Sequence, residues 1–146
     1  MLKKKTRYIF AFIAFVLLLL IRLRQEDLFY DPFILFFQNK DYKRLPIPDM
    51  QFSRYWIDLS LRYLINTILS FLIIFSLFRD RIFSKFYLRL SLLGFFILMP
   101  LMVLFIYQGS SNLYLLGFYT RRFLIQPMYL IILLPAFFFF DALKRR

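Results

Sequence analysis

Residues 63–78 read YLINTILSFLIIFSLF, an uncharged and strongly apolar run that Arg79 and Arg81 close. Trp56 precedes the run, and aromatic rings with a polar tip are favoured where a membrane meets water. About 20 apolar residues are needed to cross a hydrocarbon layer of about 30 Å. This stretch therefore predicts a transmembrane helix over 56–78.

The rest of the chain repeats this pattern, with further apolar segments at 8–23, 90–107 and 122–140. Hydrophobic residues make up 62% of the chain, whereas soluble domains hold about 45–50%. We predict an all-α fold, one integral membrane domain over 1–146 with four transmembrane helices. A neutral loop over 108–120, with its turn at 109–112, separates the last two spans.

The first span also has the layout of a signal peptide, because a basic head over 1–7 precedes a short apolar core. No pair of small residues suited to cleavage follows Leu20. We therefore predict an uncleaved helix, with a cleaved signal as the alternative. Arg7 and Arg22 would extend its reach by carrying their charges to the membrane surfaces.

An outer loop over 24–55 contains the string LFYDPFILFF at 28–37. Asp31 is suited to cap a helix, and Pro32 suits the first helical position. The apolar run that follows is too short to cross a membrane. We predict a short additional helix here, which is either interfacial or re-entrant.

The net charge of +12 lies in short basic runs between the apolar segments. This distribution favours membrane lipids as partners and argues against nucleic acid. Placing the N-terminus inside puts eleven of the 20 Lys and Arg residues on the cytoplasmic side, in short, dense segments. We predict a multi-pass protein of the inner membrane with both termini in the cytoplasm.

The inventory of reactive side chains is poor. The chain has no Cys and no His, and its only glutamate is Glu26. Thiol nucleophiles and Cys/His zinc sites are therefore excluded. No pair of acids has a spacing suited to acid–base catalysis. We predict a protein that is not an enzyme and that has no cofactor and no metal site.

Polar side chains recur inside two of the predicted spans. Arg62, Asn66 and Ser70 share one face of the second span, because they are four residues apart. In the predicted topology they lie at the outer end of the bundle, as does a second group, Arg121, Arg122 and Gln126. One interpretation is a binding site for a partner's carboxylate or a lipid phosphate. The other is that the arginines reach headgroups and the amides and hydroxyl form interhelical hydrogen bonds.

Three strings occur together: LFYDPF at 28–33, RYLINTILS at 62–70 and FYTRRFLIQPMYLIILLPAFFFF at 118–140. With the length and segment order, they make the chain resemble the exosortase F-associated membrane proteins of flavobacteria. The resemblance implies a non-enzymatic accessory protein in an exosortase-type sorting system, with that membrane enzyme as its partner. Exosortases use a Cys, an Arg and a His, so this chain is not itself the transpeptidase.

Two other functions are compatible with the sequence. One is a membrane enzyme or carrier that acts on lipid-linked glycans, with the outer-end arginines as phosphate clamps. The other is a structural membrane subunit that binds no ligand.

Overall fold

The computed structural model describes residues 4–108 and 113–144, and within these ranges every regular element is helical. The predicted all-α class is confirmed. The elements in chain order are α1 (Lys4–Leu23), α2 (Gln25–Leu28), α3 (Phe33–Gln38), a 3-10 turn η1 (Tyr42–Arg44), α4 (Phe52–Phe78), α5 (Arg81–Gln108), α6 (Tyr114–Ile125) and α7 (Met128–Lys144).

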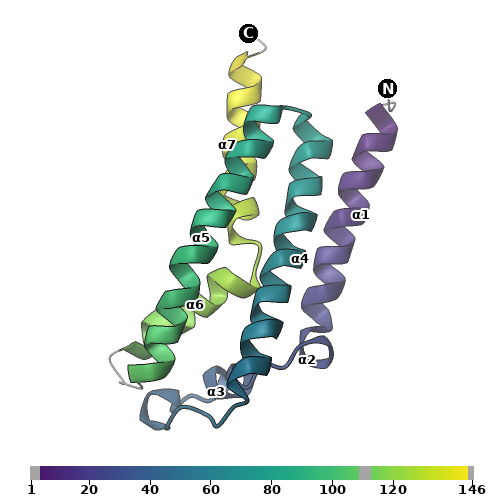
Figure 1. The fold of residues 1–146 in the computed structure, drawn as a ribbon. Helices are drawn as coiled ribbons and strands as arrows, with labels where there is room; N and C mark the ends of the chain where they lie inside the picture. Colours follow the sequence, from purple (N-terminus) through teal and green to yellow (C-terminus); the bar gives the residue numbers. More distant parts are fainter. Residues whose placement is uncertain (1–3, 109–112, 145–146) are drawn as a thin grey trace.

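Three helices, α1, α4 and α5, are each long and apolar enough to cross a membrane. The pair α6 and α7 satisfies the same criterion when it is counted as one bent span, which gives up to four crossings. Figure 1 shows α4 between α1 and α5, with α7 rising beside α5. The chain is therefore a multi-pass membrane protein built as a helical bundle.

The fourth span, predicted as one helix over 122–140, is broken. The chain leaves α6 at Gln126, whose φ of −117° and ψ of 148° are extended, and resumes in α7 after a bend of 64°. Pro127 causes the break, because proline disfavours helical dihedral angles in the preceding residue and lacks an N–H donor.

The loop predicted over 108–120 is also wrong in part, because α6 is helical from Tyr114 onward. The predicted turn at 109–112 lies outside the described residues. Gly117 on α6 permits a close approach to α5, since a Cβ atom there would lie 2.5–2.6 Å from ring atoms of Phe105.

The short helix expected after Asp31 is present as α3. Asp31 Oδ1 accepts the N–H of Phe33 at 3.2 Å, as a capping carboxylate does. The rings of Phe33 and Phe36 are buried against Tyr55 and Tyr114, with centroid distances of 5.4 Å and 5.6 Å. The apolar side of α3 therefore packs against protein and closes one end of the bundle (Figure 1).

The opposite end of the bundle holds the start of α1 and the end of α7 (Figure 1). Arg7 Nε and Nη2 donate to the carbonyls of Ser76 and Leu77 at 3.0 Å and 3.1 Å, which satisfies groups that the end of α4 leaves unpaired. Lys144 Nζ lies 2.9 Å from Asp80 Oδ2. This hydrogen bond and the N–H of Ile82 hold the pKa of Asp80 below its ordinary value.

Candidate functional site

A buried carboxylate lies between two buried arginines at the end of the bundle that α3 closes. The side chain of Asp31 is 3% exposed, and its Oδ2 lies 3.2 Å from Arg62 Nη1. Arg121 makes a two-pronged contact, with Nε 3.2 Å from Oδ1 and Nη2 2.6 Å from Oδ2. Such paired hydrogen bonds are the strongest geometry available to an arginine and a carboxylate.

The surrounding elements hold these three charges in place. The chain that enters α3 is anchored to α4, because Asp58 Oδ2 accepts the N–H of Tyr30 at 3.1 Å. Arg62 is 2% exposed, donates a second hydrogen bond to Gln25 Oε1 and lies over the ring of Phe29. The network therefore joins α2, the start of α3, α4 and α6.

A cavity of about 240 Å³ opens beside this network, and we name it the arginine pocket. Its lining comes from the end of α1, from α2, α3 and α6, and from the break that follows α6. The residues that line it are Arg22, Gln25, Ile34, Phe37, Gln38, Phe118, Arg121, Arg122, Ile125 and Gln126. Among these described lining residues, three are arginines and none is acidic.

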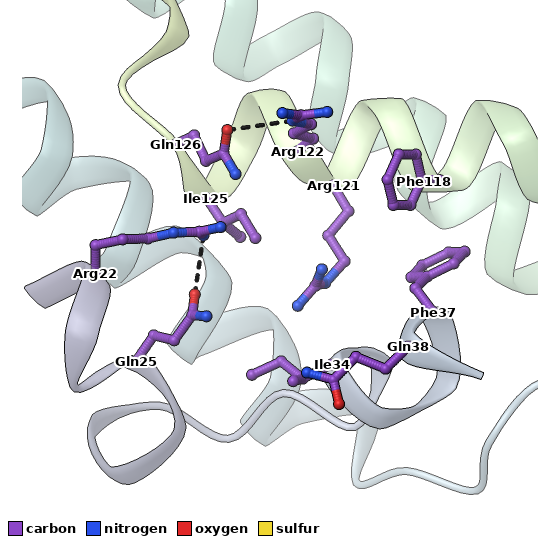
Figure 2. A pocket seen from close by; sticks show the side chains of 10 residues that line it. All are labelled: Arg22, Gln25, Ile34, Phe37, Gln38, Phe118, Arg121, Arg122, Ile125 and Gln126. Atoms are coloured by element: carbon purple, nitrogen blue, oxygen red, sulfur yellow. Dashed lines mark hydrogen bonds between the residues drawn. The ribbon is translucent and has the colours of Figure 1, made fainter. Parts of the chain in front are cut away.

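Figure 2 shows Arg121 reaching from α6 toward α3 and Arg22 reaching in from α1, with Arg122 beside Gln126. Arg22 Nη1 donates to Gln25 Oε1 at 3.0 Å, and Arg122 Nε donates to Gln126 Oε1 at 3.3 Å. Both acceptors are neutral amides, so these bonds orient the guanidinium groups without neutralising them.

The charges at this site do not balance. The three lining arginines and Arg62 carry four positive charges, and Asp31 is the carboxylate that the structure pairs with two of them. These five side chains therefore have a formal net charge of +3. Arg62 and Arg121 are buried, whereas Arg22 and Arg122 are exposed. The surplus positive charge therefore lies where an anion can approach it, which favours an anion in the pocket.

The structure separates the residues that the sequence singled out. Arg121, Arg122 and Gln126 meet in the arginine pocket, whereas Arg62 lies behind it in the ion pair. Pro32 has a helical φ of −64° at the start of α3 and does not line the pocket.

Asn66 and Ser70 have other surroundings. Asn66 Nδ2 donates to the carbonyl of Ile125 at 2.9 Å, and this interhelical bond satisfies a backbone group at the break between α6 and α7. Ser70 is fully buried one helical turn beyond Asn66 and lies outside the pocket.

Arg22 and Gln25, which form a hydrogen bond in the pocket, were not predicted as site residues. Arg22 immediately follows an apolar run, and such a residue is usually an arginine that reaches the membrane surface. The ion pair of Asp31 was also missed, because 31 residues separate it from Arg62 and 90 separate it from Arg121. Among the described residues, no group of three or more acidic or other metal-ligating side chains could hold a metal ion.

No protein-family model matches the chain, and comparisons with curated proteins and with solved structures find no match either. The fold and the site alone therefore give the class of the protein. It is an all-α multi-pass membrane protein with an arginine-lined pocket at one end.

Replacing Asp31 tests the ion-pair network. Asp31→Asn leaves Arg62 and Arg121 buried without their carboxylate, and breaking a buried pair in this way costs about 3–5 kcal/mol. We expect a clearly lower midpoint of thermal unfolding in detergent than for the exposed control Asp27→Asn.

Adding Arg121→Gln to Asp31→Asn removes one of the two unpaired charges and should restore part of the lost stability. Equal midpoints for Asp31→Asn and Asp27→Asn would show that the network does not hold the fold together.

Proposed function

We propose that this protein is a non-enzymatic accessory membrane protein whose arginine pocket holds an anionic group of another molecule. One observation carries the proposal: three guanidinium groups surround a single cavity, and two of them are oriented by neutral glutamine side chains. The planar fork of arginine matches the oxygens of a carboxylate or a phosphate better than any other side chain does.

The surface-reaching interpretation of these arginines accounts for less of the geometry. Arg121 is buried and turned into the protein, and Arg22 and Arg122 are held beside it instead of being spread around the bundle. Holding three like charges together costs free energy unless an anion or solvent compensates them. A site that binds an anion gives a physical reason for this arrangement.

We further propose an exosortase-type membrane enzyme as the partner and the inner membrane as the location, with both termini in the cytoplasm. The support is the resemblance of the 28–33, 62–70 and 118–140 strings to the exosortase F-associated proteins. In addition, the two described ends of the chain lie at the same end of the bundle (Figure 1). In this orientation the arginine pocket faces the outer side of the membrane.

Anion binding can be measured directly with glycerol 3-phosphate as the probe and calorimetric titration of the protein in a neutral maltoside detergent. Arg122→Gln should weaken binding by about tenfold or more, because a hydrogen bond to a charged group contributes about 1.5–3 kcal/mol. Arg122 is exposed and bonded only to Gln126 within the described structure, so the fold should be retained.

The matched control for this titration is Arg81→Gln, which removes an exposed arginine at the opposite end of the bundle. It should bind the probe as the unmodified protein does. Loss of affinity in both variants to the same extent, or in neither, would contradict a specific anion site in the arginine pocket.

The accessory role is tested in cells by deleting the gene and following the processing of proteins that carry a C-terminal sorting tail. We expect processing to be impaired, the exosortase-type enzyme to co-purify with the intact protein, and Arg81→Gln but not Arg122→Gln to restore processing. Normal processing in the deletion strain would overturn the proposed role, whatever the pocket binds.

A further inference from the structure

A second cavity, of about 260 Å³, lies between α1 and α7, and we name it the lateral groove. Most of its wall is apolar and comes from the second half of α1 and the start of α7. The lining residues are Phe15, Leu18, Leu19, Ile21, Arg22, Arg62, Asn66, Ile125, Gln126, Pro127, Leu130 and Ile131. Its polar members gather at the end nearest α6.

The arginine pocket and the lateral groove are adjacent, because Arg22, Ile125 and Gln126 line both of them. The break between α6 and α7 lies at this junction and creates it. A straight helix through Gln126 would continue the line of α6, whereas the observed bend of 64° turns α7 away from that line. The start of α7 then lines the groove together with α1.

The two adjacent cavities together therefore have a cationic end and an apolar end. The cationic end has the surplus of positive charge around Arg22, Arg121 and Arg122. The apolar end lies between α1, which is long and apolar enough to cross a membrane, and α7, which meets this criterion together with α6. Both helices pack on α4. An amphiphile is complementary to this arrangement, because its anionic head matches the cationic end and its hydrocarbon chain matches the apolar end.

We propose that the two cavities together bind one anionic lipid, with its phosphate in the arginine pocket and one acyl or isoprenoid chain in the lateral groove. This inference rests on the proposed anion site and names the class of molecule that occupies it. Arg22 lies in the last turn of α1, the depth at which the hydrocarbon of a bilayer gives way to headgroups.

The head and the chain have different roles in this site. Lipid tails are as apolar as leucine side chains, so the chain contributes affinity through close packing against the groove wall and not through the hydrophobic effect. Selectivity comes from the charged hydrogen bonds to the phosphate. The groove admits the lipid sideways from the bilayer and directs its phosphate to the arginines.

A soluble anion or a carboxylate of a partner protein would need only the arginine pocket. The shared chemistry of these ligands is the anionic group, and the chain distinguishes the lipid. Two probes with the same phosphate therefore separate the cases: glycerol 3-phosphate, which has no chain, and dioctanoyl phosphatidic acid, which has two.

The experiment is a calorimetric titration of both probes into the delipidated protein in maltoside detergent. The unmodified protein should bind dioctanoyl phosphatidic acid at least about tenfold more tightly than glycerol 3-phosphate. Leu19→Trp fills the groove from an exposed position on α1. It should abolish this preference and leave the binding of glycerol 3-phosphate unchanged.

The matched control is Leu17→Trp, because Leu17 is a similarly exposed leucine of α1 that does not line the groove. It should retain the preference for the lipid. Equal affinity for the two probes, or the same loss in Leu17→Trp and Leu19→Trp, would overturn the lipid site.

The outcomes also separate this inference from the proposed function. If Arg122→Gln weakens the binding of glycerol 3-phosphate but the chain adds nothing, the anion pocket stands and its occupant is a soluble anion or a partner's carboxylate. If neither probe depends on Arg122, both the anion pocket and the lipid site are wrong.

Discussion

The buried ion pair of Asp31 with Arg62 and Arg121 is the interaction on which the segment between α1 and α4 and the site both depend. Removing charges from water costs several kcal/mol for each ion, and only close pairing with good hydrogen-bond geometry compensates this cost. The carboxylate comes from the loop between α1 and α4, and the guanidinium groups come from α4 and α6. The pairing therefore fixes α3 against the bundle and holds α6 across its end.

The same interaction explains the surplus charge of the pocket. One carboxylate cannot neutralise two arginines, and Gln25 and Gln126 orient Arg22 and Arg122 without adding negative charge. A surplus of positive charge is therefore held at one end of the fold. Such sites are expected where a protein binds a ligand of opposite charge, because a binding site can keep residues that do not suit the fold when the ligand is absent.

The fold was predictable from the sequence where the signal was local. The apolar runs predicted 8–23, 56–78 and 90–107, which lie within α1, α4 and α5, and the Asp31-Pro32 pair predicted the short helix α3. The break at Pro127 was not predicted, because proline is common in the first turn of a helix and the sequence alone did not show that another helix ended just before it. The helical period grouped Arg62 with Asn66 and Ser70. However, it could not show that Asp31, distant in the sequence, pairs with both Arg62 and Arg121.

The most direct test of the central claim is a carbon–phosphorus dipolar-recoupling NMR measurement on protein labelled with ¹³C at the arginine Cζ atoms. The protein would be delipidated and frozen in maltoside detergent with one equivalent of dioctanoyl phosphatidic acid. We predict dephasing of the Arg22, Arg121 and Arg122 signals by phosphorus, assigned by single lysine substitutions, at separations that a direct N–H···O bond of about 2.7–2.9 Å requires. Unchanged arginine signals in the presence of the lipid would contradict the claim.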